Sequence, residues 1–577
     1  MMKYLLFFFS FVLLVCLTKG DLPIHALMGD VIGVWEIKET KSMSERAVHC
    51  GGGIPNRNLE NLSSHLKDYE KFLKRKYGNI NKILVKLTME KIKVANETNP
   101  RNKWTYLAVR SVNNNAIIGY WTMVYDEGFE IRLKGRRYFG LFKYEKRPSE
   151  SCPEAIENKN EKDSRCYKTD PTKTHIGWVL DEQIEETTRE KKFQWGCFYG
   201  QKDQKTDVSA FVIHNEKKIP EHDNNNLGGE IKSEEEKGLS FSVLTQRANY
   251  QKIRLALEKL YGKTKTSLAN IYGDIGDKIY GCHKQDIVNL KIRLTLPKNF
   301  TWGDPYTDEN FNEEVDEQRD CGSCYSISSV YILEKRFEIM SWKKYKKKIN
   351  IPKLSYQSVI SCSPYNQGCD GGFPFLVGKH MYEFGILSES LMKYENNDTV
   401  KCKMNIGTYN SSYFYGYYKN KTDDIFYASN YNYINGCYEC SNEYDMMNEI
   451  LMNGPIVAAI NATPQLLNLY NLNDKNIVYD TVTNENQVCD VPNEGFNGWQ
   501  QTNHAIAIVG WGEQTDENNK LVKYWIIRNT WGNKWGYKGY LKFQRGINLA
   551  GIESQAVFID PDFSRGRPKE LLAKQQA

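Results

Sequence analysis

Residues 318–331 read Gln-Arg-Asp-Cys-Gly-Ser-Cys-Tyr-Ser-Ile-Ser-Ser-Val-Tyr, and the periodic apolar segment that follows them predicts a helix that begins at Cys324. A thiol at a helix N-terminus is close to unpaired backbone N–H groups and to the positive end of the helix dipole, and both favour the thiolate. We therefore predict that Cys324 is a nucleophile. Gln318 can direct a side-chain N–H at the oxygen of a carbonyl under attack, together with the backbone N–H of Cys324.

The same cysteine has a second interpretation, because Cys321 and Cys324 have the spacing of a redox or zinc-binding Cys-x-x-Cys pair. No second cluster with metal-ligand spacing accompanies the pair, and we expect no metal. The pattern Gln318-x5-Cys324, with the string Cys-Gly-Ser-Cys-Tyr, resembles the active-site helix of papain-like cysteine proteases. Most of these enzymes carry Trp directly after the nucleophile. The Tyr325 found here resembles the cathepsin C (dipeptidyl peptidase 1) branch, which carries Tyr.

A candidate base follows near the C-terminus. Of nine histidines, only His504 sits in a setting fit for catalysis, at the mouth of the buried-strand pattern Ala-Ile-Ala-Ile-Val at residues 505–509. The resemblance implies that Asn529 orients the His504 ring, that Trp531 shields their hydrogen bond, and that Thr530 replaces the usual Ser without penalty. Cys324 and His504 would then form a thiolate–imidazolium pair that cleaves a peptide through an acyl-enzyme. The alternative is a histidine that only fills the core.

Length and charge narrow the class of protein. The chain has 577 residues and a mass of 67.0 kDa, which predicts two or three domains. Its 77 basic and 71 acidic residues are interspersed, so the sequence shows no nucleic-acid footprint. Residues 1–20 read as a secretory signal peptide, with Lys3 before a short apolar run. We expect a protein of the secretory pathway without a membrane span in its mature form; a retained signal anchor is the alternative.

A β-rich region precedes the catalytic motifs. Strand patterns at residues 31–37, 116–125, 129–133, 138–144 and 177–180 predict a small all-β domain, most simply a barrel. The tract 59–94, with charges and leucines at mixed helical spacing, is interpreted as an insertion. Strings such as Gly-Tyr-Trp-Thr-Met-Val-Tyr at 119–125 and Gln-Trp-Gly-Cys-Phe at 194–198 resemble the exclusion domain of the cathepsin C branch. We assign residues 21–205 to this domain.

The resemblance also implies disulfide bonds, which an oxidising compartment permits. It pairs Cys50 with Cys197, Cys321 with Cys369, and Cys362 with Cys402. The family's other exclusion-domain bridge lacks one partner here, because Ala26 stands at that position. We expect that Cys166 pairs instead with the additional Cys152, and we leave four cysteines unassigned: Cys282, Cys437, Cys440 and Cys489.

The remaining domains follow from composition and resemblance. Residues 206–295 are polar and form an activation peptide or a helical linker. Residues 296–577 form the peptidase domain, for which the resemblance implies an α+β papain-like fold with a helical lobe and a β-barrel lobe. A further cut within residues 480–500, giving heavy and light chains, is implied by the resemblance alone.

Substrate-binding residues are implied as well. Gly371 and Gly372 allow a substrate main chain to add as a strand, although a simple Gly-Gly turn is the alternative. The resemblance implies that Asp21, the first mature residue, binds the α-ammonium of the substrate. It also implies a chloride ion held by Phe373 and Tyr433, with Phe375 in place of a further Tyr.

These residues predict a cysteine dipeptidyl aminopeptidase that acts on the free N-termini of peptides and proteins and is matured by an activating protease. We expect no metal or organic cofactor and a lysosome-like, digestive-vacuole-like or extracellular location. The Asn/Lys-rich loops resemble apicomplexan dipeptidyl aminopeptidases of this family. A papain-like endopeptidase and a non-catalytic binding protein on a protease fold are the alternatives. Oligomeric state, physiological substrate and side-chain preference stay open.

Overall fold

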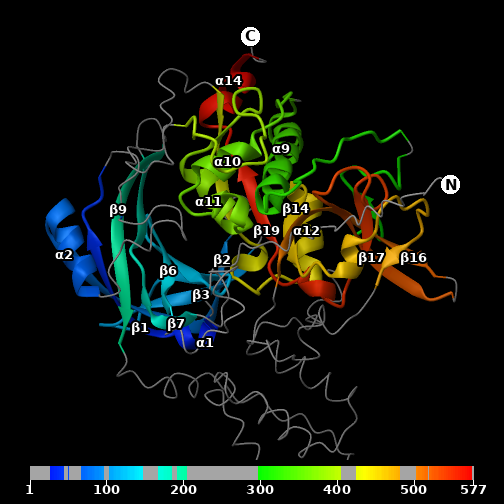
Figure 1. Ribbon diagram of the computed structural model, residues 1–577. Helices are drawn as coiled ribbons and strands as arrows, with labels where there is room; N and C mark the ends of the chain where they lie inside the picture. Colours follow the sequence, from blue (N-terminus) through cyan, green and yellow to red (C-terminus); the bar gives the residue numbers. More distant parts are fainter. Residues whose placement is uncertain are drawn as a thin grey trace, which may run out of the picture.

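A computed structural model describes residues 26–43, 50, 66–95, 103–146, 167–184, 191–203, 296–308, 310–347, 349–404, 424–480, 502–516 and 519–574. Several expectations lie outside these residues: the signal peptide, Asp21, the Cys152–Cys166 bond and the segment 206–295. The cut expected within 480–500 falls there too, apart from Asp480. The described chain forms an N-terminal β domain, blue to cyan in Figure 1, and a C-terminal α+β domain, green to red.

The N-terminal domain is one antiparallel sheet in the order β1-β2-β3-β4-β5-β6-β7-β9-β8. Pairing of β1 with β9 joins the two sides of the sheet and closes a barrel. Trp35, Trp121 and Phe129 fill its interior. The elements are α1 (Met28–Val31), β1 (Gly33–Thr40), α2 (Leu66–Tyr77), β2 (Ile80–Ala95), β3 (Lys103–Ser111), β4 (Ile117–Val124), β5 (Gly128–Leu133), β6 (Arg136–Lys146), β7 (Tyr167–Thr174), β8 (Gly177–Ile184) and β9 (Lys191–Lys202).

The interpretation of residues 59–94 as an insertion is wrong for residues 80–94. These residues form β2, which pairs with both β1 and β3. Val85 and Leu87 are buried with the partly exposed Lys86 between them, but Leu84 on the other side of Val85 is exposed. An apolar residue at an exposed position hid the two-residue period of a half-buried strand. Residues Leu66–Tyr77 do form a helix, as the mixed spacing suggested.

The C-terminal domain has two lobes. One contains α9 (Cys324–Tyr345), α10 (Tyr356–Cys362), η6 (Gly368–Asp370), α11 (Pro374–Glu383) and the pair β11 (Ile386–Leu387) and β12 (Ile425–Phe426). The other is a sheet in the order β13-β19-β14-β16-β17-β18-β15, with β10 beside β16. Its elements are β10 (Phe300–Thr301), β13 (Ala428–Tyr433), η8 (Ile434–Gly436), α12 (Glu443–Asn453), β14 (Ile456–Ile460), α13 (Pro464–Leu467), β15 (Val478–Tyr479), β16 (His504–Thr515), β17 (Leu521–Arg528), β18 (Tyr540–Gln544), η9 (Leu549–Gly551) and β19 (Val557–Pro561). After β19 the chain returns to the helical lobe, where α14 (Gly566–Lys574) packs beside β12 (Figure 1).

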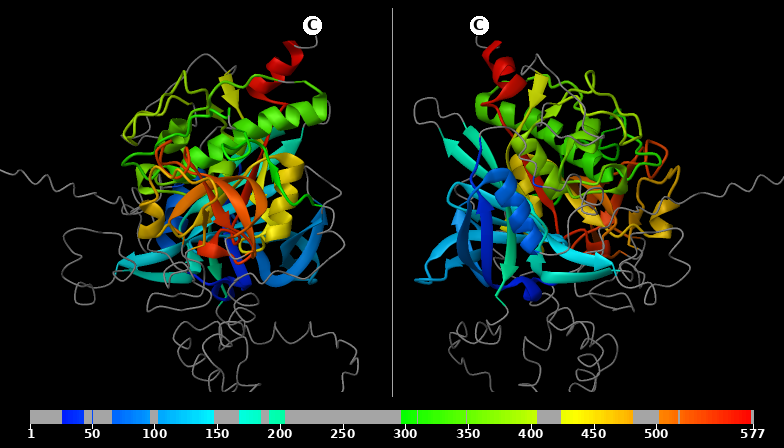
Figure 2. Two further views of the ribbon diagram at one scale, coloured as in Figure 1. Left: turned by 90° about the vertical axis from the view of Figure 1, so that its right-hand side faces the viewer. Right: turned by 60° about the vertical axis from the view of Figure 1, so that its left-hand side comes forward.

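Buried charges connect the two domains, which lie side by side in Figure 1 and one in front of the other when the peptidase domain is turned toward the viewer (Figure 2, left). Glu130 on β5 accepts a hydrogen bond of 2.8 Å from the Tyr431 hydroxyl, and its carboxylate lies 3.7 Å from Lys379 Nζ on α11. Arg132 donates to the backbone oxygen of Tyr431 at 3.1 Å. Because the Glu130 and Lys379 side chains are both 0% exposed, this contact fixes the barrel firmly against the peptidase domain.

The described cysteines form four disulfide bonds. Cys50–Cys197, Cys321–Cys369 and Cys362–Cys402 are the three pairs that the family resemblance implies. Cys437 and Cys440, left unassigned from the sequence, form the fourth. Of the helices in the described ranges, none has the length and apolar character to cross a bilayer.

Candidate active site

The thiol of Cys324 lies at the first residue of α9. Ser323 precedes it, and the carbonyl of Ser323 accepts hydrogen bonds from the N–H groups of Ser326 and Ile327, so the helix starts where the sequence predicts. The first turn carries no acidic side chain that would repel a thiolate. Cys324 is the free cysteine of the described chain and is buried. Ser328, one turn later, donates to the Ala505 carbonyl at 3.0 Å and holds α9 against β16.

His504 is the first residue of β16 and pairs in register with Ile460 of β14. Its Nε2 lies 2.7 Å from Asn529 Oδ1. An amide oxygen only accepts, so this contact assigns the proton to Nε2 and leaves Nδ1 as the nitrogen that can take a proton from a thiol. The Trp531 ring stacks on the imidazole, with centroids 4.4 Å apart, and covers the hydrogen bond.

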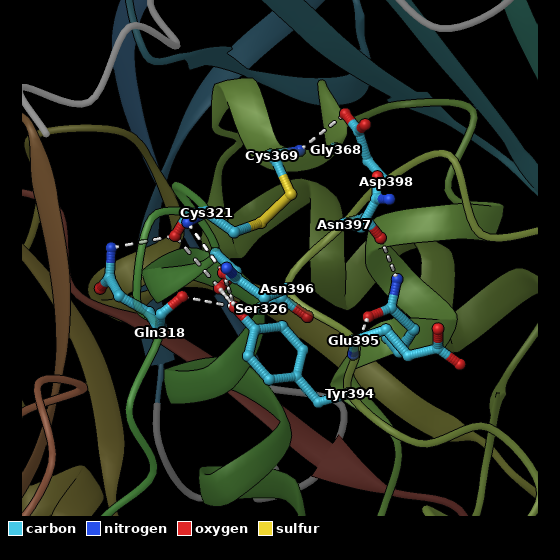
Figure 3. The surroundings of a disulfide bond; sticks show 12 residues. Gln318, Cys321, Ser326, Gly368, Cys369, Tyr394, Glu395, Asn396, Asn397 and Asp398 are labelled. Carbon is cyan, nitrogen blue, oxygen red and sulfur yellow. Dashed lines mark hydrogen bonds between the residues drawn. A yellow bond between two sulfur atoms is a disulfide. The ribbon is translucent and has the colours of Figure 1, made fainter.

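Gln318 is tied to the same loop as Asn529. Its backbone N–H donates to the Thr530 carbonyl at 2.8 Å, and the Thr530 hydroxyl donates to Gln318 Oε1 at 2.6 Å. Gln318 Nε2 donates to the carbonyl of Cys321 at 3.2 Å, beside the Cys321–Cys369 disulfide (Figure 3). The amide is therefore held with Oε1 toward Thr530, and a second proton of Nε2 is available for a substrate oxygen.

Burial sets the resting protonation of the two central groups. It raises the pKa of the Cys324 thiol to about 11. Backbone hydrogen bonds at Ala505 and at the start of α9 lower this pKa, as the helix start predicts, but by less than burial raises it. Burial also lowers the pKa of His504 to about 4, against the hydrogen bond to Asn529. Neither shift is caused by a charge on the other residue. The thiolate consequently depends on transfer of the thiol proton to His504, and the helix N-terminus alone does not supply it.

A cavity of about 250 Å³ is lined by both Cys324 and His504. Its walls come from the start of α9, the Gly371–Gly372 turn, the first residue of β16 and the loop before β19. The lining also includes Gly371, Gly372, Phe373, Phe375, Tyr433, Thr502, Gln555 and Val557. The two glycines and the three residues expected around chloride therefore border the same space as the thiol, whereas Gln318 and Asn529 are not among the lining residues.

The barrel reaches this cavity through the turn between β4 and β5. Tyr125 in the turn stacks on Phe373, with ring centroids 5.2 Å apart, and its hydroxyl accepts a hydrogen bond of 3.2 Å from the Thr502 N–H. Its φ of 51° is left-handed, an uncommon conformation for a residue other than glycine. In the next residue, the Asp126 carbonyl accepts a hydrogen bond of 2.9 Å from the N–H of Ala26. The described N-terminal end of the chain thus lies beside the turn that abuts the cavity.

Two contacts of the site escaped the sequence reasoning. Thr530 was expected only to substitute for Ser, whereas it holds the Gln318 amide. Tyr125 was assigned to a strand with no role at the site. The tyrosine directly before Asp-Glu-Gly was a turn signal that could have placed it at a loop tip, but nothing local indicated which pocket the loop reaches.

We expect that Thr530→Val lowers kcat/KM about tenfold, because the Gln318 amide loses the donor that fixes its orientation. Thr530→Ser keeps a hydroxyl and is expected to remain within twofold of wild type. Gln318→Ala sets the upper limit, a loss of about 10²–10³ in kcat if the amide serves the oxyanion. Steady-state kinetics of the three variants test this ranking. A Thr530→Val enzyme as active as wild type would show that the bond has no part in catalysis.

Comparison with known proteins agrees with this architecture. Residues 296–559 match the profile of the papain family cysteine proteases, and residues 21–202 match that of the cathepsin C exclusion domain. Dipeptidyl aminopeptidase 1 of Plasmodium falciparum (isolate 3D7) is 31% identical over 695 aligned positions, covering 98% of this chain and 97% of that protein. Cathepsin C of Schistosoma mansoni is 27% identical, covering 77% of this chain and 84% of that protein.

Another relative covers less than half of the chain. Pro-cathepsin H of Bos taurus is 27% identical over 255 aligned positions, which cover 44% of this chain and 62% of that protein. One relative that spans nearly the whole chain, a match to the exclusion-domain profile and a Cys–His–Asn arrangement on one scaffold all agree. The chain therefore belongs to the papain family of cysteine proteases, in the branch that carries the cathepsin C exclusion domain.

Proposed function

We propose that this protein is a cysteine dipeptidyl aminopeptidase, which removes dipeptides from the free N-termini of peptides and proteins. The observation that carries the proposal is the contact of the barrel with the wall of the catalytic cavity, through Tyr125 on Phe373 and Thr502. A papain-like cleft open at both ends cuts within chains. A domain packed against one end leaves room for only a short N-terminal piece of substrate before the thiol.

In the proposed mechanism, His504 Nδ1 takes the proton of Cys324, and the sulfur attacks the carbonyl carbon of the second residue. The backbone N–H of Cys324 and the Gln318 amide stabilise the oxyanion. The protonated ring then gives its proton to the departing amine. Water attacks the acyl-enzyme with His504 as base and releases the dipeptide, while Asn529 keeps the ring oriented through both steps.

We further propose that the carboxylate of Asp21 binds the substrate's α-ammonium. Asp21 lies outside the described residues, but Ala26 is hydrogen-bonded to Asp126, next to the turn that abuts the cavity. Five residues of extended chain span at most about 17 Å, so Asp21 lies within that distance of Ala26. An ion pair that is partly shielded from water there would discriminate strongly against substrates without a free amine.

A pair of fluorogenic peptides tests this proposal. We expect the mature enzyme to release the reporter from a dipeptide amide with a free N-terminus and to cleave the acetylated peptide at least about 10²-fold more slowly, because acetylation removes the charge that Asp21 binds. Asp21→Asn is expected to lose most of this preference while the thiol stays reactive. Efficient cleavage of the acetylated peptide by wild type would favour the endopeptidase alternative. An unreactive thiol would favour the binding protein.

Maturation and location follow from the same proposal. We infer that residues 1–20 are removed, that residues 206–295 are excised by an activating protease, and that the mature protein consists of an exclusion domain from 21 to 205 and a peptidase domain from 296. A cut within 480–500 and a Cys152–Cys166 bond stay predictions. A lysosome-like compartment suits a site whose base has a pKa lowered to about 4, because His504 then stays available in acid.

The expectation of no metal or organic cofactor is separate from the expectation of a chloride ion. Papain-family catalysis requires no metal or organic group, and the described residues contain no cluster of three metal-binding side chains. Chloride is different, because the resemblance assigns it donors that can be examined. The Phe373 N–H donates to Asn366 Oδ1 at 2.9 Å, and Phe375 has no hydroxyl. Only the Tyr433 hydroxyl remains as a donor, so the residues of this chain do not fit the ion.

A further inference from the structure

We propose that Asn366 takes the place of the expected chloride ion, and that its side chain positions the cavity wall so that the peptidase works without chloride. The inference concerns the cavity of the proposed aminopeptidase and rests on that function. It starts from three observations: the hydrogen bond from Phe373 to Asn366, the lack of room for a side chain at Gly372, and the aromatic rings around Tyr433.

Asn366 is bonded through both ends of its side-chain amide. Its Oδ1 accepts the Phe373 N–H at 2.9 Å, and its Nδ2 donates to Ser363 Oγ at 3.0 Å. The side chain is 1% exposed. A backbone N–H in a partly buried cavity wall needs an acceptor, and the neutral amide oxygen of the buried Asn366 supplies one without the cost of burying an anion.

The Gly371–Gly372 turn is shaped around this side chain. A Cβ on Gly372 would lie 2.4 Å from Asn366 Oδ1 and 2.8 Å from Tyr325 Cε2, so no larger residue fits there. Asn366 therefore packs directly beneath the segment that passes the nucleophile. The amide holds Phe373, whose other face carries Tyr125 of the barrel, and thereby fixes the wall between the thiol and the blocked end of the cavity.

Aromatic rings border the rest of the expected ion site. Phe375 stacks on Tyr433 with centroids 4.9 Å apart, and the Tyr433 hydroxyl accepts the Tyr125 N–H at 3.3 Å. The Phe375 ring brings no donor, and a single hydroxyl does not compensate for the desolvation of an anion.

A chloride titration of the wild-type enzyme is the primary test. Mature enzyme is dialysed into sodium gluconate, and dipeptide release is measured while chloride replaces gluconate up to 150 mM, about physiological ionic strength, which is held constant. Across the series we expect kcat/KM to change less than twofold. We expect Tm to change by less than about 1 °C. Saturable activation by chloride, with no response to equal gluconate, would overturn the proposal. Release of dipeptides at the highest chloride concentration is measured first. A protein that releases none there fails the proposed function, and this outcome is distinct from a failure of the chloride proposal.

Variants test whether Asn366 acts through Phe373. Asn366→Ala is expected to raise KM about tenfold with a smaller effect on kcat, because the loss of one buried hydrogen bond loosens a binding wall and leaves the thiol in place. Asn453→Ala removes a partly exposed amide that donates to Glu449, far from the cavity, and serves as the matched control. An unchanged KM in Asn366→Ala would overturn the positioning role.

A double variant separates the proposed role of Asn366 from general destabilisation, because destabilisation alone would not make KM depend on halide. Asn366→Ala with Phe375→Tyr frees the Phe373 N–H and adds a hydroxyl beside Tyr433. We expect chloride or bromide, but not gluconate, to restore KM in this variant with a saturable dependence. No halide response in a folded double variant would overturn the assignment of Asn366 to the ion's place. If the double variant does not fold, the wild-type titration decides alone.

Discussion

Cys324→Ala is expected to lower kcat by about 10⁶, because the acyl-enzyme needs the sulfur. His504→Ala is expected to lower kcat by a similar factor, and the double variant to be no worse than either single variant, since the two groups act as one unit. Single-turnover release of the reporter, at protein concentrations measured by absorbance, measures the effect. A Cys324→Ala protein that retains a hundredth of the wild-type rate would place the nucleophile elsewhere.

The pH profile reports the same pair. Burial raises the pKa of the Cys324 thiol to about 11 and lowers that of His504 to about 4. The pair therefore carries one proton over a wide pH range: it gains a second proton, on His504, only near pH 4, and it loses the last proton only in strong base. We expect a broad bell in kcat/KM, with the acid limb near pH 4 and the basic limb well above pH 9. Asn529→Ala removes the hydrogen bond that raises the pKa of the ring and should shift the acid limb further down. An acid limb near the ordinary imidazole value of 6.5 would contradict the burial of His504.

The two central residues of the candidate site could be proposed from local sequence. A cysteine at a helix start and a histidine at the mouth of a buried strand each depend on neighbours within a few residues, and the structure places both on one cavity. The asparagine partner came from the resemblance, and the hydrogen bond to His504 Nε2 now supports it. Local pattern also located most barrel strands, with ends shifted by a few residues.

What the sequence could not provide are contacts between distant segments. Glu130 meets Tyr431 across 301 residues of chain, and no periodicity connects them. The Cys437–Cys440 bond was missed although the two cysteines are three residues apart. Their spacing suits a metal site as well as a bridge, and only the fold brings their sulfurs together. Strand β2 was misread because its pairing with β1 and β3, rather than its own lysine-rich pattern, decides its conformation.

Lys379→Met is expected to lower the free energy of unfolding by about 3 kcal/mol and to loosen the barrel from the peptidase domain. Lys379 Nζ lies 2.6 Å from Glu383 and 3.7 Å from Glu130, and all three side chains are 0% exposed. Removing the cation leaves two buried carboxylates with less compensation, which typically costs about 3–5 kcal/mol; Glu130 retains Arg132 at 2.6 Å, so we expect the lower end. Denaturant titration measures the loss, with the exposed Lys344→Met as control.

Loosening of the barrel should change specificity as well as stability. Without a firmly seated barrel, Tyr125 no longer holds the end of the cavity. We therefore expect cleavage of an acetylated peptide to rise relative to dipeptide release in Lys379→Met, but not in Lys344→Met. Glu383→Gln in the Lys379→Met background should recover part of the stability, because Glu383 is the buried carboxylate that loses its nearest cation, whereas Glu130 retains Arg132. Additive losses in this double-mutant cycle would show that the two side chains do not interact.

The pH dependence of the stability loss separates the ion pair from simple packing. Burial would raise the pKa of Glu130, but Arg132, Lys379 and Arg137, with the Tyr431 hydrogen bond, outweigh it and lower the pKa from 4.5 to about 2. Because the folded-state pKa is depressed, the stabilisation is complete above pH 4.5 and is lost as the pH falls through 2. The difference between wild type and Lys379→Met should thus be constant above about pH 5 and should shrink below 4.5. A difference independent of pH down to 2 would mean that Lys379 contributes through its methylene chain rather than through its charge.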